Sequence, residues 1–440
     1  MENNVSENKE PMMERLHHKM HQGAKPAGKG AIGFIFAAVF LDLLGAGILI
    51  PVLPYLVRQY SADALTLGLL ALSFSAAQFI AAPILGALSD RYGRRPLLVF
   101  SVLGSGLAYF MFGLGGSLLV LFIARIIDGL TGGNISIAQA YIADVTPPKD
   151  RAKNFGLIGA AFGMGFIFGP ALGGVLSNIS LQAPAYAAGI LSLVTAAFGF
   201  FVLPESLPVA QRKSGVFSLS EINPVKQLGE AFKRPSIRII LLAIFAQNFA
   251  FSGLQTNFSL FSLARFNMGP QENALVFTFI GVVGVIMQGF VVRKIVNKVS
   301  DNMLAIVGLT IMAAGFALTA FAPAIWVLFP ALAGVSIGSA LSTPTLTNLV
   351  SKQVSGREQG SILGTTQSVN ALTRVFGPVW AGATFDTMGA ASPYWTGALW
   401  LVAAAVIVLT VKTTRTPARE QAPTMGSGQP ERVSSAVSGK

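Results

Sequence analysis

The chain has 440 residues and a net charge of +12, but only 11% of its residues are charged and 52% are hydrophobic. A soluble domain has about 25% charged residues, so this composition excludes an ordinary water-soluble fold. The absence of cysteine excludes disulfides, thiol chemistry and thiolate metal sites.

Twelve apolar stretches, each long enough to cross a bilayer as a helix, follow one another along the chain. They cover residues 31–57, 66–88, 96–116, 117–142, 154–177, 183–203, 237–263, 273–292, 303–321, 325–349, 360–385 and 393–411. Glycine and proline inside them are typical of membrane helices, because neighbouring helices satisfy the freed backbone groups. The alternating segments of a membrane β-barrel are absent from the sequence. We therefore predict an all-α membrane protein with 12 transmembrane helices.

The polar ends, residues 1–29 and 412–440, show no hydrophobic periodicity, so we expect disordered tails. The first apolar stretch is too long for a signal-peptide core and has no obvious cleavage site. The stretch GAKPAGKG (23–30) ends in Gly30 where a phosphate-binding loop needs Ser or Thr, and it follows no strand. All three histidines lie in the N-terminal tail, where we expect no structural metal site. No cofactor is expected.

The first of four charged residues inside the apolar stretches is Asp42; the others are Arg125, Asp128 and Arg374. Each costs roughly 2.5–3.5 kcal/mol at a helix centre on insertion scales, so we expect each to face the bundle interior. Asp42 could bind a proton in one conformation and release it in another, or serve as a structural hydrogen-bonding group near a gate. Asp128, three residues after Arg125, could relay protons with it or merely neutralise it. Arg374 could satisfy carbonyls beside the break at Gly377.

The stretch GALSDRYGRRP (86–96) holds the densest charge cluster, between the second and third apolar stretches. A loop of about seven residues makes these two spans antiparallel neighbours, and its glycines permit a tight turn. The candidate residues of this loop motif are Gly86, Asp90, Arg91, Gly93, Arg94 and Arg95.

The stretch GAAFGMGFIFGPALGG (159–174) places glycines at four-residue steps in the fifth span. Small residues on one helix face allow another helix to pack closely, and a proline bends the helix. The candidate residues are Gly159, Gly163, Gly165, Gly169, Pro170, Gly173 and Gly174. They serve either ordinary packing or a hinge.

Polar side chains inside several spans are candidates for lining a central cavity. They are Asn134, Gln139, Gln247, Asn248, Gln255, Asn257, Gln367 and Asn370, together with Arg374. Phenylalanine is frequent, with 32 residues, and is plentiful around the seventh span. Aromatic walls with few hydrogen-bonding groups suit bulky, partly apolar ligands.

The longest internal polar segment, 204–236, divides the chain into two sets of six spans, 30–203 and 237–411. It contains either a short amphipathic helix on the membrane surface or an unstructured linker. A shift of 208 residues aligns glycines of the two halves: Gly45 with Gly253, Gly156 with Gly364, Gly169 with Gly377 and Gly174 with Gly382. Parallel six-span halves are typical of transporters with a midplane site.

Lysine and arginine are distributed unevenly over the loops. If both termini share one side, 27 of the 31 lie there, and the opposite loops hold only Arg58 and Arg265. This positive-inside pattern predicts that both termini are cytoplasmic. The basic excess thus reports topology, and we expect no nucleic-acid partner.

With its loop motif, its span-5 motif and the stretch LDLLGAGILIPVLPYL (41–56), the chain resembles the major facilitator superfamily over nearly all its spans. Within it, the chain is similar to the drug:proton antiporters, including the tetracycline-efflux branch. The resemblance implies two pseudo-symmetric six-helix bundles that export drugs against protons, with an arginine of the fourth span near the proton route. It also implies that the span-5 motif resists leak and that the loop motif latches the outward-open state. The matching second-half loop, RKIVNKVSDN (293–302), has lost the motif's Asp-Arg-Gly arrangement.

For the latch, we expect Asp90 to cap a neighbouring helix and Arg91 and Arg94 to pair with carboxylates across the seam between the halves. Asp144, at the end of the fourth span, is a candidate partner. Alternatively, the arginines only enforce topology.

The sequence predicts no enzyme and no nucleotide-binding domain, which leaves an ion gradient to drive transport. The expected partners are a small-molecule substrate, protons and the bilayer, and a monomer is expected. A proton-coupled sugar or metabolite transporter stays open as an alternative, as does, more remotely, a non-transporting membrane receptor or scaffold.

Overall fold

The apolar stretches of the sequence form long helices in the computed structural model, which describes residues 29–147, 150–212, 229, 232–296, 298–354 and 358–411. Both polar tails and most of the segment 204–236 lie outside the described residues. The helices of the first half are α2 (Lys29–Leu49), α3 (Leu53–Arg58), α4 (Ala64–Tyr92), α5 (Arg94–Leu114), α6 (Leu118–Thr131), α7 (Asn134–Val145), α8 (Arg151–Leu176), α9 (Ala183–Val202) and the short η2 (Val209–Gln211).

The second half is helical as well, and no strand occurs among the residues that the structure describes. Its helices are α11 (Pro235–Phe266), α12 (Pro270–Ile286), η4 (Met287–Val291), α13 (Val292–Ile295), α14 (Asp301–Ala320), α15 (Ile325–Ser351), α16 (Gln359–Met388) and α17 (Ser392–Leu409). The predicted all-α class is confirmed.

Within the described ranges, eleven segments are long and apolar enough to cross a membrane. The helix α16 is a twelfth long helix, thirty residues in length, but it is not among these eleven. It is the least hydrophobic of the long helices, because Gln367, Asn370 and Arg374 lie within it. The predicted count of twelve spans therefore agrees only approximately with the structure.

Three of the predicted spans are interrupted. The first consists of α2 and α3, separated at residues 50–52. The fourth consists of α6 and α7, separated at Gly132 and Gly133, where the Gln78 amide donates a hydrogen bond to the freed Gly132 carbonyl at 3.1 Å. The eighth contains one π-helical turn, Met287–Val291, between α12 and α13. A glycine pair and a π-turn both interrupt the regular backbone ladder and are common at functional sites.

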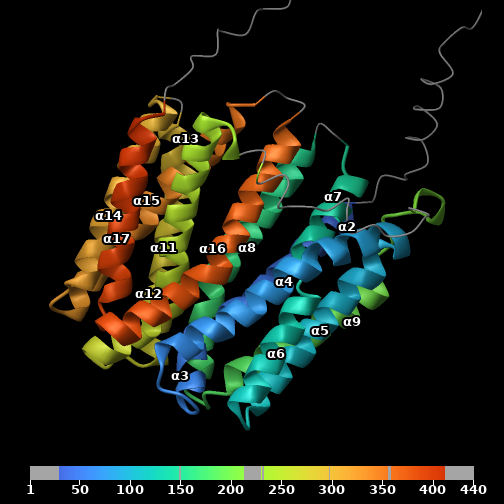
Figure 1. Cartoon of the computed structure of the whole chain (residues 1–440). Coiled ribbons are helices and arrows are strands. Elements are labelled where there is room, and N and C mark those ends of the chain that lie inside the picture. Colours follow the sequence, from blue (N-terminus) through green and yellow to red (C-terminus); the bar gives the residue numbers. More distant parts are fainter. Residues whose placement is uncertain are drawn as a thin grey trace, which may run out of the picture.

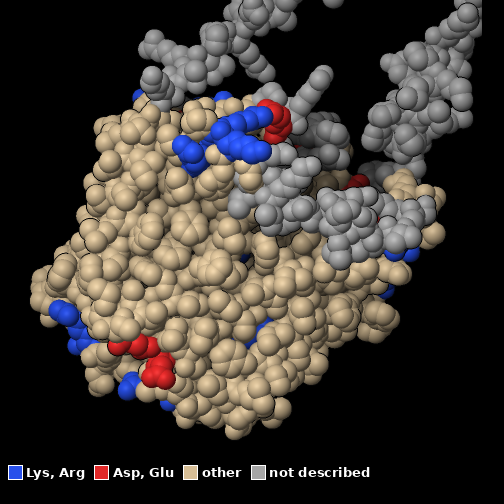
Figure 2. Space-filling view, in the orientation of Figure 1, with Lys and Arg blue, Asp and Glu red and all other residues tan. Residues whose placement is uncertain are grey.

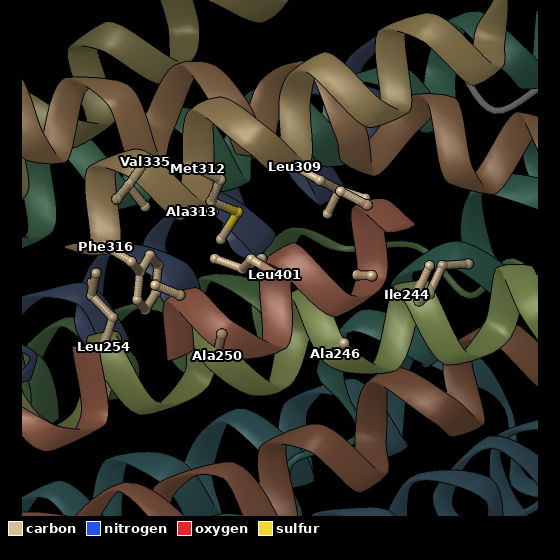
Figure 3. Close-up of a cluster of buried hydrophobic side chains, with 14 of the residues drawn as sticks. Ile244, Ala246, Ala250, Leu254, Leu309, Met312, Ala313, Phe316, Val335 and Leu401 are labelled. Atoms are coloured by element: carbon tan, nitrogen blue, oxygen red, sulfur yellow. The ribbon is translucent and has the colours of Figure 1, made fainter. Parts of the chain in front are cut away.

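The helices pack as two bundles, α2–α9 and α11–α17 (Figure 1). Figure 3 shows part of the core of the second bundle, where side chains of α11, α14, α15 and α17 meet. Ala250, Met312, Phe316, Val335 and Leu401 there are fully buried. Apolar side chains thus fill the inside of this bundle.

The bundles meet along two helix pairs, α8 against α12 and α4 against α16. Figure 1 shows α4 and α16 adjacent near α3 and separating towards the opposite end. A Cβ added to Gly68 would lie 2.5 Å from the Pro378 carbonyl oxygen, and one added to Gly382 would lie 2.5 Å from the Ala64 carbonyl oxygen. We call the end where α3 lies the α3 end, and the end carrying Gly86–Pro96 the motif end.

Charged side chains on the face seen in Figure 2 gather near the two ends, with an almost wholly uncharged band between them. This distribution matches a bilayer, in which exposed charge is costly.

Candidate functional site

Asp42 of α2 lies beside the break in the fourth span. The Asn134 side-chain amide donates a 2.7 Å hydrogen bond to the Asp42 carboxylate. Asn134 is the first residue of α7, directly after the glycine pair, so the break brings it to α2. The Asn134 side-chain oxygen is buried and has no hydrogen-bond partner in the part of the chain that the structure describes. The Asp42–Asn134 pair therefore keeps one unsatisfied acceptor, the Asn134 side-chain oxygen, among the described residues of the first bundle.

The Arg125 and Asp128 side chains form an ion pair on α6. The Arg125 guanidinium lies 3.4 Å from the Asp128 carboxylate, and the side chains are only 15% and 8% exposed. The guanidinium also stacks 5.6 Å from the ring centre of Phe74 and 5.2 Å from that of Phe112. Asp42 is within electrostatic range of Asp128. The interior of the first bundle thus holds two carboxyl groups and one guanidinium.

The four polar residues of α11 that were predicted to line a cavity lie in different surroundings. The Gln247 amide donates a 2.6 Å hydrogen bond to the Thr343 hydroxyl of α15, and Gln255 is half-buried. Asn248 donates to the Ile244 carbonyl of its own helix at 2.9 Å, and Asn257 is fully buried in the second bundle. Gln247 therefore joins two helices of the second bundle.

Gln367, Asn370 and Arg374 lie on one stripe of α16, spaced three and four residues apart. Four residues further along this stripe, Pro378 touches α4 at Gly68. The stripe therefore faces the opening between α4 and α16, on the motif-end side of their contact. Gln367 and Arg374 are exposed on this stripe, so α4 does not cover it there. Gln139 on α7 is exposed as well.

Arg94 is the centre of the loop motif. It forms ion pairs with Asp90, four residues earlier, and with Asp144 of α7 at 3.0 Å. Its guanidinium also donates a 2.7 Å hydrogen bond to the Ser89 hydroxyl. Gly93 has φ of 108°, a conformation that favours glycine, and so permits the sharp turn between α4 and α5.

Arg94 pairs within the first bundle in this structure, whereas the contact across the seam is expected in the outward-open state and stays a prediction. Asp144 is its partner as predicted, but both residues belong to the first bundle. Arg91 forms no ion pair among the described residues. Asp90 forms an ion pair with Arg94, and its expected role as a helix cap stays a prediction.

Glu205 completes the loop motif, although the sequence alone did not single it out. Its carboxylate accepts hydrogen bonds from the backbone N–H groups of Arg94 at 2.8 Å and Arg95 at 3.3 Å, capping the start of α5. The Arg95 guanidinium stacks 5.6 Å from the Phe200 ring centre. The only sequence signal for Glu205 is an acidic residue directly after the sixth apolar stretch.

The span-5 glycines serve two different contacts. Gly165, Gly169 and Gly173 pack against α2, and a Cβ on Gly169 would lie 2.6 Å from the Gly47 Cα. Gly163 and Gly174 face α12 of the other bundle instead. Gly159 has open space around it, and Pro170 lies inside α8. The motif therefore joins α8 both to its own bundle and to its neighbour.

The α3 end is closed by polar contacts that the sequence did not predict. The Tyr55 hydroxyl donates a 2.7 Å hydrogen bond to the Met268 carbonyl and accepts one of 2.6 Å from the Asn273 amide. Burial raises the pKa of the Tyr55 hydroxyl, so it keeps its proton and remains a donor. The Asp386 carboxylate accepts from the backbone N–H groups of Ala64 at 3.0 Å and Leu65 at 2.8 Å, capping α4 from the other bundle.

A family model described as Major Facilitator Superfamily matches residues 35–378 and 294–437. The chain belongs to the major facilitator superfamily. The class C tetracycline resistance protein of Escherichia coli is 32% identical over 86% of this chain and 95% of its own. Multidrug resistance protein 2 of Bacillus subtilis is 30% identical over 80% of this chain and 88% of its own.

Among solved structures, the human organic anion transporter MFSD10 is similar with a TM-score of 0.67 and 25% identity, covering 87% of this chain and 100% of its own. Major facilitator proteins are multi-pass membrane transporters of small molecules, and this chain is one of them rather than an enzyme. The resemblance stated from the sequence motifs is thereby confirmed.

Proposed function

We propose that this chain is a proton-coupled exporter of lipophilic drugs, including tetracycline-like compounds, that works by alternating access as a monomer in the bacterial inner membrane. The motif end, with both termini, faces the cytoplasm in this proposal. Support comes from the relatives, which are tetracycline and multidrug resistance proteins, and from the concentration of lysine and arginine on one side of the spans.

The observation that carries the proposal is the group of ionisable side chains inside the first bundle. The Asp42 carboxylate accepts a 2.7 Å hydrogen bond from Asn134 and lies within electrostatic range of Asp128, which is itself paired with Arg125. Two carboxyl groups and one guanidinium in the same bundle interior are together one positive charge short of neutrality. Uptake of one proton restores that balance, which is the chemistry that a proton-coupled carrier needs.

The state described here is closed at the α3 end and open towards the motif end, as an inward-facing carrier must be. In the proposed cycle, drug enters from the cytoplasm, the bundles rock, and the contacts of Tyr55 and Asp386 break as the α3 end opens. Protons then bind and return inward through the same site. A membrane potential of 100 mV supplies about 2.3 kcal/mol per proton, which sustains a roughly forty-fold gradient of a neutral drug.

Proton movement in proteoliposomes tests the proposal. Purified chain is reconstituted with an internal pH dye, an acid-inside gradient is imposed, and tetracycline is added outside. We expect tetracycline to accelerate proton efflux from wild-type liposomes and not from Asp42→Asn liposomes. The matched control is Asp63→Asn, which removes an exposed carboxylate from a loop at the α3 end.

The two variants distinguish a specific loss of proton coupling from general damage to the protein. If Asp63→Asn behaves as wild type and Asp42→Asn binds tetracycline without moving protons, Asp42 carries the coupling. Full coupling in Asp42→Asn removes this residue from the mechanism. Tetracycline transport that continues unchanged when the pH gradient and the voltage are both collapsed refutes the exporter itself.

A further inference from the structure

Arg374 is a cation in the middle of the transport pathway whose charge nothing in the described chain neutralises. It lies midway along the thirty-residue α16, about 22 Å from the first residue of that helix at 1.5 Å per residue. It has no ion pair or hydrogen bond within the described ranges, whereas Arg94 and Arg125 both have carboxylate partners. The sequence-based alternative, that Arg374 satisfies carbonyls beside Gly377, is not what the structure shows.

The stripe position of Arg374 determines what it faces. Pro378, four residues further on, touches Gly68 of α4, and Arg374 itself is exposed. Because α4 and α16 are antiparallel, Arg374 lies opposite the part of α4 that follows Gly68. From Leu72 to Gly86 that helix contains no acidic residue. The charge therefore points into the opening between the bundles, and the facing wall offers it no counterion.

A guanidinium at this depth costs free energy unless it is hydrated or paired, so intramembrane arginines mark ion or substrate pathways. Its planar array of donors matches carboxylates and other anionic oxygens in a bidentate way. Gln367 and Asn370 on the same stripe add amide groups towards the motif end. The facing part of α4, from Leu72 to Gly86, is largely apolar and has no charged residue, which favours a ligand with a hydrophobic body.

We propose that Arg374 is the anion-recognition residue of the transport site, and that the preferred substrates are lipophilic organic anions whose acidic group binds its guanidinium. This deepens the proposed function, on which it rests, by naming the charge class of the substrate. Asp42, about 20 Å along α2 from the motif end, would stay free to exchange protons inside the first bundle.

A matched pair of ligands tests the assignment. 1-Pyrenebutyrate and 1-pyrenebutyramide share the same ring and chain and differ in the charge of one end. Their binding to full-length protein in nanodiscs is measured by calorimetry, with empty nanodiscs subtracted. We expect the wild type to bind the anion at least ten times more tightly than the amide. Arg374→Gln should bring this ratio close to one, and Arg374→Lys should retain most of it.

The control is Arg265→Gln, which removes an arginine at the α3 end whose side chain donates to the Ala322 carbonyl. It should keep the wild-type ratio. Equal binding of both ligands by the wild type, or an unchanged ratio in Arg374→Gln, overturns the assignment. An Arg374 that only neutralised Asp42 in another state would change proton coupling and leave the acid-to-amide ratio intact.

Failure of this inference is distinguishable from failure of the proposed function. If the ratio is one in every variant while tetracycline still drives protons through wild-type liposomes, the exporter stands and the anion preference falls. If tetracycline moves no protons, the exporter falls, and the binding ratio still reports on Arg374.

Discussion

At the residue scale, ionisable side chains occupy three environments. Arg94 and its carboxylates form a mostly buried network at the motif end, Asp42 and Asp128 lie inside the first bundle, and Arg374 faces the opening. A buried charge is retained only if it is paired or used. The Arg94 network therefore stabilises the fold, whereas the charges inside the first bundle and at Arg374 are available for transport.

The Arg94–Asp144 pair should contribute measurably to stability. Their side chains are 9% and 22% exposed, so solvent screens the pair only partly. A double-mutant cycle of Arg94→Gln and Asp144→Asn, read as free energies of unfolding in detergent, should give a coupling energy of about 1–3 kcal/mol. The same cycle on Arg234 and Glu358, which are 53% and 44% exposed, should give less than about 1 kcal/mol. Equal couplings would mean that burial does not strengthen the first pair.

Asp386 should favour the closed α3 end, because its carboxylate caps α4 from the opposite bundle. An N-terminal cap contributes about 0.5–2 kcal/mol, and here the contact is lost whenever the bundles separate. Asp386→Ala should therefore raise the population open at the α3 end by roughly two- to thirty-fold. The readout is the rate at which an impermeant maleimide reaches a cysteine at position 367 from the α3 side.

The chain has no native cysteine, so this labelling has no background. Asp63→Ala, which alters a neighbouring exposed carboxylate that accepts a hydrogen bond from Ser61 of its own loop, serves as the control. An Asp386→Ala protein that labels no faster than this control would show that the cap does not bias the two states.

At the element scale, α8 shows how one glycine motif serves two contacts. Gly169 and Gly173 allow α2 to approach closely, whereas Gly159 faces open space. Sequence spacing alone placed all these glycines in one motif, because a four-residue step describes a helix face and not the helix that covers it. The structure separates them by partner.

Alanine substitutions along α8 should follow this division. A Cβ at Gly173 would lie 2.2 Å from the Ile48 carbonyl oxygen and one at Gly169 would lie 2.6 Å from the Gly47 Cα, so both contacts are backbone and cannot yield easily. Gly169→Ala and Gly173→Ala should each destabilise the protein by about 1–3 kcal/mol, as overpacking does. Gly159→Ala should leave the midpoint of thermal unfolding unchanged or slightly raise it. A uniform loss across all three would mean that the motif acts through helix flexibility rather than packing.

The sequence located the helices well, because twenty apolar residues in a row have few alternatives to a membrane span. It did not show the break at Gly132, since hydropathy stays high through a pair of glycines. It placed Arg94 and Asp144 in the same six-span half, but residue spacing carries no information on which state of a two-state molecule holds a given contact. Asp386 and Tyr55 escaped notice for a related reason: their partners are more than two hundred residues away.

At the scale of the whole molecule, the 208-residue repeat is visible in the seam. Gly174 of α8 and Gly382 of α16 correspond under this shift, and each lies where its helix meets the other bundle, at Ala274 and Ala64 respectively. Equivalent glycines therefore make equivalent contacts on the two sides of the molecule. A seam built from two matching helix pairs lets the bundles rock about it, closing one end as the other opens.

Accessibility from the two sides of the membrane tests both the orientation and the conformation. Gln367 is exposed in the opening, and Ile179 is 77% exposed in the turn between α8 and α9 at the α3 end. An impermeant maleimide should label Gln367→Cys in everted vesicles and leave it largely unlabelled in spheroplasts, while Ile179→Cys should show the reverse pattern. If the two variants showed each other's labelling pattern, the motif end would face the outside of the cell, which would contradict the charge asymmetry of the loops. Rapid labelling of Gln367→Cys from both sides would mean that the contacts of Tyr55 and Asp386 do not hold the α3 end closed in the membrane.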